Sequence, residues 1–320
     1  MSNIEFDGQV FSSEEGESVL DCLLRNGVQI PHSCKNGICH SCVMVCVDGQ
    51  LDPESQKGIK DSQQKAGYFK SCVCRASGEM TVSMSQKEEL FQASIIEKKT
   101  LNERTLLIRL SKPNSFEYES GQFINLIRIA DGLSRSYSIA SIPSDDYIEL
   151  HIRYYEDGKM SSWLKEVAEV GEAVEFSGPF GGCYYLPGKE SEDILLAGIG
   201  TGMAPLYGIA RDALAKGHTG KISVVQGAMN ENGLYYVDEF SAIANGNENV
   251  TYIPSTVDGS GDFKEGKIDD VVKESFPSLK GFRVYLCGSP NTVNRLKRYS
   301  FLAGANMADI YSDPFTPAGS

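Results

Sequence analysis

The chain has 320 residues, of which 41% are hydrophobic and 23% charged, which is typical of a globular protein and argues against long disorder. The 30 lysines and arginines against 43 aspartates and glutamates give a formal net charge of −13, which disfavours wholesale binding to nucleic acid or anionic lipid. No apolar run reaches the roughly 20 residues of a membrane span, and we find no export signal. We therefore expect a cytoplasmic protein with two or three domains.

Residues 1–86 begin with a strand in which Ile4 and Phe6 alternate with polar positions. An acidic turn follows, and the next residues predict a helix over 18–26 with one apolar stripe and a stop at Gly27. Residues 43–47 form a second strand-like run that ends at a turn dipeptide, Asp48-Gly49. Polar residues 83–89 predict a linker.

The cysteines indicate metal or redox chemistry, because nine is an odd count in a chain without an export signal. Cys34, Cys39 and Cys42 follow one another with four and then two intervening residues, and Cys72 comes later. This is the spacing of a plant-type [2Fe–2S] cluster, in which one loop supplies three thiolates. Gly37 permits the positive φ that such a loop needs. A four-cysteine zinc site is the alternative.

The fourth ligand has two candidates, Cys72 and Cys74. We prefer Cys72 because its spacing fits the plant-type pattern. The other nearby cysteines are interpreted as small buried residues, and the histidines as polar loop residues: Cys22, Cys46, His32 and His40.

After the linker the pattern changes twice. Short β-rich runs separated by turns dominate residues 91–190 and predict an antiparallel barrel: 106–110, 122–129, 137–140, 147–154 and 173–177. From residue 191 buried strands at 194–197, 222–225, 250–253 and 283–286 alternate with helical segments such as 204–215. Such alternation predicts a parallel α/β sheet over residues 191–320.

These features together resemble a known family. Residues 1–86 resemble a plant-type ferredoxin domain with a β-grasp fold, and the rest resembles the flavin and nicotinamide domains of the ferredoxin–NADP reductase superfamily. This order is similar to the reductase components of bacterial multicomponent oxygenases, and also to a reductase of deoxysugar biosynthesis. The resemblance implies a multidomain α+β and α/β protein, with domains at 1–86, 91–190 and 191–320.

Residues 135–138, Arg-Ser-Tyr-Ser, are similar to the superfamily's flavin signature. Arg135 can fork onto a phosphate oxygen, Tyr137 can lie on the isoalloxazine face, and Ser138 can hydrogen-bond a ring nitrogen. The alternative is a solvated arginine beside a core tyrosine.

A second element starts at Gly158 and continues as Lys159, Met160 and Ser161. It begins a short helix whose N–H groups can bind a pyrophosphate, and the family equivalent binds the FAD pyrophosphate through Lys-Met-Ser. A surface helix capped by Ser161 is the alternative. The presence of two separate flavin-binding elements, at residues 135–138 and 158–161, favours FAD over FMN as the cofactor. The resemblance also implies two positions near the ribityl chain and phosphate: His151 and Arg153.

Residues 198–205 follow a buried strand and open a helix, which is the context of a dinucleotide-binding loop. They resemble the superfamily's G-x-G-T-G-x-x-P loop, so Gly200, Thr201 and Gly202 are predicted to cradle the nicotinamide nucleotide. Gly227, after the second strand, is a further candidate. A tight strand-to-helix turn is the alternative.

Downstream, Cys287 and Gly288 resemble a family motif that puts a cysteine near the nicotinamide. The tail, residues 310–315, matches a family ending whose aromatic ring covers the flavin; we assign Phe315 to this role, with Tyr311 as the rival. A buried structural cysteine and a disordered tail are the alternatives. The predicted catalytic positions are thus Ser138, Cys287 and Phe315.

The nucleotide preference rests on a departure from the family pattern. Met229 stands where many relatives carry arginine, and the following residues up to Tyr236 hold Glu231 and no basic residue. A 2′-phosphate needs arginine or lysine nearby, so NADH is favoured over NADPH.

The resulting prediction is a monomeric reductase that passes electrons from NADH through FAD and a [2Fe–2S] cluster to an oxygenase or other acceptor protein in a transient contact. We expect no nucleic acid and no membrane among its binding partners. A deoxysugar dehydrase system is the rival acceptor, and a non-enzymatic metal-stabilised interaction protein is the alternative from another class.

Overall fold

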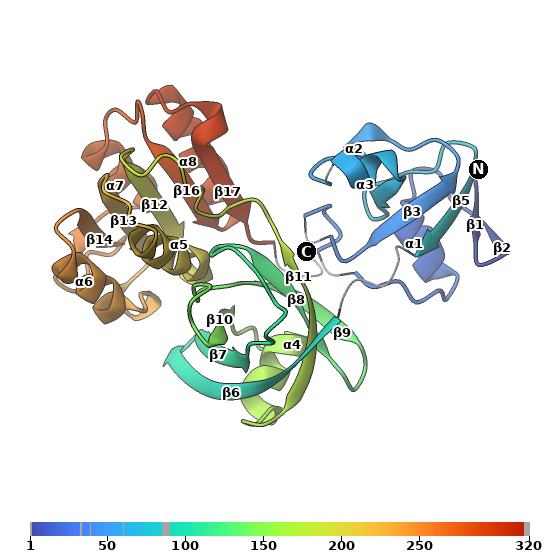
Figure 1. The fold of residues 1–320 in the computed structure, drawn as a ribbon, viewed down its shortest axis with the longest axis horizontal. Helices are drawn as coiled ribbons and strands as arrows, with labels where there is room; N and C mark the ends of the chain where they lie inside the picture. The colour runs from blue at the N-terminus through green and yellow to red at the C-terminus, as the bar shows by residue number, and fades with distance from the viewer. Residues whose placement is uncertain (1, 33, 39, 60, 85–89, 317–320) are drawn as a thin grey trace. The chain divides into compact units, whose positions relative to one another are not determined.

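The computed structural model describes residues 2–32, 34–38, 40–59, 61–84 and 90–316 (Figure 1). They divide into two compact units. The first holds the described residues up to Leu90 together with Gly132–Ser136, and the second holds Phe91–Asp131 and Tyr137–Thr316. Within these ranges, no helix has the length and apolar character needed to cross a membrane.

Five strands form a mixed sheet in the first unit, in the order β2-β1-β5-β3-β4. β1 runs parallel to β5, and the other neighbouring pairs are antiparallel. Helix α1 shares one hydrophobic core with the sheet, in which Leu20 and Leu23 pack with Ile4 and Met44. This is the predicted β-grasp arrangement. Its elements are β1 (Asn3–Phe6), β2 (Gln9–Ser12), α1 (Val19–Arg25), β3 (Val43–Asp48), α2 (Pro53–Gln56), α3 (Asp61–Lys65), β4 (Tyr68–Lys70) and β5 (Glu79–Met84).

The predicted linker over 83–89 is wrong at its first two residues. Ser83 and Met84 belong to β5 and pair with Val45 and Met44 of β3. The remaining five positions lie outside the described residues.

Six strands form a second sheet in the order β10-β7-β6-β11-β8-β9, in which the pairs β10-β7, β7-β6 and β11-β8 are antiparallel. All of it lies in the second unit except Leu90 and residues 133–136 of β9. A bridge between Ile139, just after β9, and Leu150 of β10 joins the two ends of this sheet and closes the predicted barrel. Phe91, Phe116 and Phe176 pack ring against ring inside it. Its elements are β6 (Leu90–Asn102), β7 (Thr105–Ser111), β8 (Phe123–Arg128), β9 (Leu133–Ser138), β10 (Tyr147–Arg153), α4 (Lys159–Ser162), η1 (Trp163–Val167) and β11 (Ala173–Phe180).

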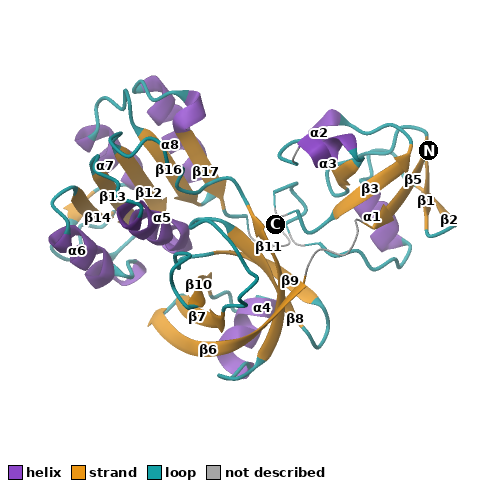
Figure 2. Cartoon of the chain, viewed as in Figure 1, coloured by secondary structure: helices purple, strands orange, loops and turns teal. Residues whose placement is uncertain are grey.

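The rest of the second unit is a parallel sheet in the order β15-β14-β13-β12-β16-β17, with helices around it (Figure 2). α5 and α6 share a core with one face, and α7 and α8 with the other. The predicted fold class is therefore confirmed. Its elements are β12 (Ile194–Ile199), η2 (Gly200–Gly202), α5 (Met203–Ala215), β13 (Ile222–Ala228), η3 (Glu231–Gly233), α6 (Val237–Gly246), β14 (Val250–Thr256), β15 (Lys264–Glu265), α7 (Ile268–Ser275), β16 (Arg283–Gly288), α8 (Pro290–Leu302), η4 (Met307–Asp309) and β17 (Ile310–Pro314).

The strand order places a topological switch point between β12 and β16. From β12 the chain adds β13 and β14 on one side, and β16 and β17 then lie on the other side. In open parallel sheets, ligands bind beyond the carboxyl ends of the strands at such a point. The glycine loop that follows β12 and the Cys287-Gly288 pair that ends β16 meet there.

A buried arginine fixes the segment that connects barrel and sheet. Arg283, at the start of β16, is fully buried, and its guanidinium donates to the carbonyls of Leu186 and Lys189 at 2.6 and 2.8 Å. We expect Arg283→Ala to destabilise the second unit by about 3 kcal/mol, because it removes both hydrogen bonds and leaves a cavity in place of a fully buried side chain. Arg104→Ala, at an exposed position, should cost less than about 0.5 kcal/mol. Thermal denaturation of the two variants measures this difference in stability. Equal melting temperatures would contradict the role of Arg283 in fixing the connecting segment.

Candidate functional site

The cysteine loop of the first unit has the backbone that a cluster requires. Lys35, Gly37 and His40 have φ values of 54°, 71° and 58°, so the chain turns back on itself repeatedly. The backbone N–H of Asn36 points at the sulfur of Cys34 at 3.3 Å, which is the kind of bond that offsets charge on a thiolate. A Cβ on Gly37 would stand 3.1 Å from Val73, so the glycine keeps the loop close to the Cys72 segment.

The start of α1 anchors the segment that carries Cys72. The N–H groups of Val19 and Leu20 donate to the carbonyls of Cys74 and Ser71 at 2.9 and 3.1 Å. They are among the N–H groups that a helix leaves without internal partners, so the segment satisfies the helix end. Ser71 in turn donates its hydroxyl to the carbonyl of Cys42 at 2.7 Å.

Three of the four predicted ligands, Cys34, Cys42 and Cys72, are therefore described in this region, and Cys39 lies outside the described residues. The rival, Cys74, is fully buried in the hydrophobic core, and burial raises the pKa of its thiol. Within the described ranges, no three His, Cys, Asp or Glu side chains lie close enough to bind one metal ion. The donor set and the loop conformation fit a [2Fe–2S] cluster.

Strand β9 carries the flavin signature. Arg135 and Tyr137 lie two positions apart on it and are both partly exposed. Arg135 donates to the carbonyl of Ser134 at 2.7 Å. Ser138, at the end of the strand, is buried and donates its hydroxyl to a carboxylate oxygen of Asp313 at 3.4 Å.

The second predicted flavin element begins at Gly158, which is the N-cap of α4 and makes no side-chain cap bond. A Cβ there would stand 2.3 Å from the hydroxyl of Ser161, so only glycine fits. Ser161 accepts from the N–H of Tyr155 at 3.2 Å, which holds the loop against the helix, so Ser161 is not the helix cap. Met160 is buried, and Lys159 is exposed. The tight, uncapped helix start fits a bound phosphate.

His151 and Arg153 both face the parallel-sheet domain. The ring nitrogens of His151 lie 3.0 Å from Glu149 and 3.1 Å from the hydroxyl of Tyr235. Burial alone would raise the pKa of Glu149, but bonds from His151 and Arg109 outweigh it and lower the pKa to about 2. This polar cluster joins the barrel to the sheet domain, and the place of His151 near the ribityl chain and phosphate of a flavin stays a prediction.

Arg153, by contrast, stands beside the glycine loop. Its guanidinium lies 3.3 Å from the position that a Cβ would take on Gly200. A cation at this place can contact the phosphates of a nucleotide bound by the loop.

The glycine loop packs directly against the end of β16. Gly200 has a φ of 52°, and a Cβ on Gly202 would stand 2.4 Å from the carbonyl oxygen of Cys287. Gly288 also lies close, since a Cβ there would stand 3.0 Å from the carbonyl oxygen of Ile199. Thr201 lies between the two glycines and is partly exposed. These glycines form a cradle that larger residues would fill, which fits a dinucleotide.

Gly227 has a packing role. A Cβ on it would stand 2.8 Å from the side chain of Ile268 on α7 and 3.3 Å from Ile199. Its lack of a side chain thus lets the helix approach the sheet.

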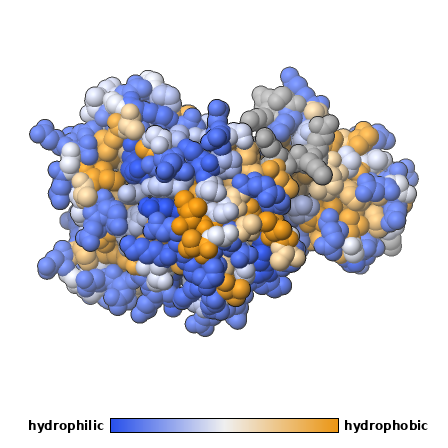
Figure 3. Space-filling model, turned by 60° about the horizontal axis from the view of Figure 1, so that its bottom comes forward, coloured by the Kyte–Doolittle hydropathy of each residue, from blue (hydrophilic) through white to orange (hydrophobic). Residues whose placement is uncertain are grey.

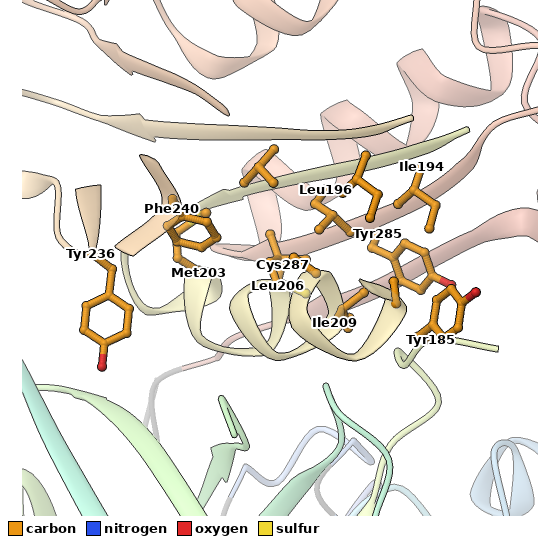
Figure 4. Close-up of a cluster of buried hydrophobic side chains, with 14 of the residues drawn as sticks. Tyr185, Ile194, Leu196, Met203, Leu206, Ile209, Tyr236, Phe240, Tyr285 and Cys287 are labelled. Carbon is orange, nitrogen blue, oxygen red and sulfur yellow. The ribbon is translucent and has the colours of Figure 1, made fainter. Parts of the chain in front are cut away.

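Cys287 is buried among Met203 and Leu206 of α5 (Figure 4). Its sulfur lies 3.8 Å from the sulfur of Cys183, and burial raises the pKa of its thiol far above the usual range. A neutral thiol cannot act as a nucleophile, which fits the predicted non-covalent role.

The tail is an ordered strand. β17 pairs in parallel with β16, so Asp313 lies opposite Cys287, and the N–H of Phe315 donates to the carbonyl of Gly288 at 2.7 Å. The disordered alternative is therefore wrong for residues 310–314. Tyr311 stacks on Tyr285 with ring centroids 4.8 Å apart, which commits its ring to the sheet and favours Phe315 as the covering ring.

Asp313 is a site residue that the sequence reasoning missed. Asp313 is partly exposed and accepts a hydrogen bond from Ser138, and desolvation raises the pKa of its carboxyl to about 6 despite that bond. The available signal was an acidic residue within the predicted tail motif, residues 310–315. Ser138, Cys287, Asp313 and the glycine loop thus gather at the switch point.

Three family models match the chain. A 2Fe-2S iron-sulfur cluster binding domain matches residues 3–77, an oxidoreductase FAD-binding domain matches 92–185, and an oxidoreductase NAD-binding domain matches 195–297. These matches confirm the three predicted cofactors: an iron–sulfur cluster, FAD and a nicotinamide nucleotide.

Relatives match over nearly the whole chain. The naphthalene 1,2-dioxygenase system ferredoxin–NAD(P)+ reductase component of Pseudomonas putida is 32% identical over 99% of this chain and 98% of that protein. The reductase subunit of an aromatic O-demethylase from an Amycolatopsis species is 28% identical over 98% of each. Among solved structures, an Amycolatopsis cytochrome P450 reductase has a TM-score of 0.70 at 26% identity and covers 99% of both chains. The ferredoxin reductase of carbazole 1,9a-dioxygenase, with a TM-score of 0.68 at 20% identity and 98% of both chains covered, shares the fold.

Proposed function

Because this chain belongs to the family of ferredoxin–NAD(P)+ reductase components of oxygenase systems, we propose that it takes electrons from NADH and delivers them to an oxygenase partner. The chain is an oxidoreductase with an iron–sulfur, a flavin and a nicotinamide domain. We place the domain boundaries at 1–86, 91–190 and 191–320, and the three family matches fall inside these ranges.

One observation carries the proposal. The hydroxyl of Ser138, at the end of the flavin strand, bonds Asp313 at the switch point of the parallel sheet. The end of the flavin strand therefore lies beside the carboxyl edge where the glycine loop meets Cys287. The residues that would hold FAD on β9 and those that would hold a nicotinamide at this edge therefore meet in one place, as hydride transfer between the two groups requires.

The proposed roles of the residues follow from their places. Arg135 and the start of α4 bind FAD phosphates, Tyr137 and Ser138 orient its ring system, and the glycine loop with Arg153 binds the nucleotide phosphates. Phe315 covers the flavin and excludes water until the nicotinamide displaces it. Bound FAD supplies the change from two-electron to one-electron transfer, and the cluster carries single electrons onward. The proposed cluster ligands are Cys34, Cys39, Cys42 and Cys72.

The preference for NADH is supported at the end of β13. Met229 is exposed there, and the backbone N–H of the neighbouring Glu231 donates to the hydroxyl of Ser260 at 2.8 Å. A carboxylate in this place would repel a 2′-phosphate, and the segment up to Tyr236 holds no lysine or arginine.

An anaerobic titration tests the function. We expect NADH to bleach the flavin and cluster absorbance and then to support reduction of cytochrome c, with kcat/KM at least about tenfold above that of NADPH. Glu231→Gln should reduce the preference for NADH over NADPH. Glu248→Gln, which removes a distant exposed carboxylate, should leave this preference unchanged. A preference for NADPH would overturn the assignment of the nucleotide, and no bleaching by either would overturn the function.

Asp313 should give hydride transfer a pH dependence. Donation of hydride leaves positive charge on the nicotinamide, which a carboxylate stabilises and a neutral carboxyl does not. With a pKa of about 6, Asp313 is protonated below that pH and ionised above it, so flavin reduction should accelerate as pH rises from 5 to 7. The groups that face it are Ser138 and Cys287.

We expect Asp313→Asn to slow flavin reduction by about tenfold at pH 7.5, equal to about 1.4 kcal/mol, and to flatten the profile. Asp309→Asn, in the same tail but paired with Lys189, should preserve the profile. Stopped-flow reduction at saturating NADH measures both, and an unaltered profile in Asp313→Asn would exclude this role.

The partner is an oxygenase component, by analogy with the relatives, in a transient contact with a monomeric reductase in the cytoplasm. The net charge of −13 favours a partner with a basic rim. On the face shown in Figure 3, apolar side chains reach the surface in separate patches among polar ones, so this view singles out no docking surface.

A further inference from the structure

A buried lysine lies inside the cysteine loop. Lys70 ends β4, two residues before Cys72, and only 5% of its surface is exposed. Its Nζ lies 3.5 Å from the position that a Cβ would take on Gly37, in the loop that follows Cys34. It also donates to the carbonyl of Lys57. These contacts hold the ammonium group against the loop and away from water.

A buried ammonium group is costly unless negative charge lies nearby. Two other lysines of the first unit pair with exposed carboxylates, Lys35 with Asp21 and Lys57 with Glu54. Lys70 has no such ion pair among the described residues. Gly37, against which the Nζ packs, lies between Cys34 and Cys42, and Cys72 follows Lys70 by two residues, so the ammonium group stands among the segments that carry the proposed thiolate ligands.

We propose that Lys70 is an internal counter-ion of the [2Fe–2S] cluster and raises the reduction potential of the cluster. The inference rests on the proposed ligand set. Reduction adds one negative charge to the cluster, and a cation fixed in a buried site stabilises the reduced form more than the oxidised form. Net charge, hydrogen bonds and solvent exposure are the factors by which a protein sets such a potential. Lys70 thereby favours transfer of electrons from the flavin to the cluster.

The test is a spectroelectrochemical titration of the purified full-length protein, with electron paramagnetic resonance of the reduced cluster. In Lys70→Gln and Lys70→Met, the equilibrium constant for cluster reduction should fall about tenfold, which is about 59 mV for a one-electron couple. Lys70→Arg keeps the charge and should stay near the wild-type value. Lys35→Gln is the matched control, because that lysine is about half exposed and solvent screens its charge.

An unchanged potential in a neutral variant that retains both irons overturns the proposal, and so does an equal shift in Lys35→Gln. If Lys70→Gln and Lys70→Met both lose the cluster, Lys70→Arg distinguishes charge from packing. A cluster in Lys70→Arg supports the counter-ion role of Lys70. Loss of the cluster in Lys70→Arg as well would mean that Lys70 serves packing alone, which overturns the proposal. A wild-type protein without a cluster signal would overturn the proposed function as well, whereas an unchanged potential overturns this inference alone.

Discussion

Replacement of Cys72 by alanine is expected to abolish electron output while leaving the flavin reaction intact. Cys72→Ala removes a proposed thiolate ligand, so the cluster absorbance should disappear and cytochrome c reduction should fall to background. NADH should still reduce the flavin, because the second unit holds the whole predicted path of the hydride. The measurement combines iron analysis, the visible spectrum and NADH oxidation with a dye that takes electrons from the flavin.

Cys74→Ala is the matched control, since both cysteines are buried in one core and lie two residues apart. It should retain the cluster and lose only about 1 kcal/mol of stability from the small cavity. Retention of the cluster in Cys72→Ala together with its loss in Cys74→Ala would reverse the choice of fourth ligand.

Local sequence patterns were sufficient to predict those elements whose structure depends on residues close together in the chain. Residues 194–205 predicted a buried strand, a glycine turn and a helix, because each signal lies within a few residues of the element it specifies. The spacing of the cysteines likewise predicted a cluster-binding loop, since one short segment supplies three ligands. Strand β6 was missed entirely, since none of the predicted runs overlaps it. Register shifts near Ile95 and Thr100 break its alternation, so no period of two runs through its 13 residues.

Partners that are distant in sequence could not be predicted. Ser138 and Asp313 are 175 positions apart, and His151 and Tyr235 are 84 apart. Each pair meets only because the barrel packs against the parallel sheet, and no periodic pattern encodes that contact. For the same reason the sequence did not predict the contacts of His151 with Glu149 and Tyr235.

Replacement of Gly202 by alanine should block hydride delivery from NADH. The φ of Gly202 is −60°, so alanine can adopt this backbone conformation without strain. The obstacle is space, because the new Cβ would stand 2.4 Å from the carbonyl oxygen of Cys287 and 2.6 Å from the N of Gly288. These are backbone atoms of a central strand, so the glycine loop must move away from the switch point.

A displacement on the order of 1 Å at a reacting centre can cost about 100-fold in rate, and we expect a loss of this size in the rate of flavin reduction by NADH. FAD and iron content should stay normal, and dithionite should reduce both cofactors as in the wild type. Gly246→Ala, at the end of α6 where a Cβ meets open space, should behave like the wild type. Anaerobic stopped-flow spectroscopy compares the three proteins. A wild-type rate in Gly202→Ala would show that the loop can shift without consequence, and residues 200–202 would then not hold the nucleotide.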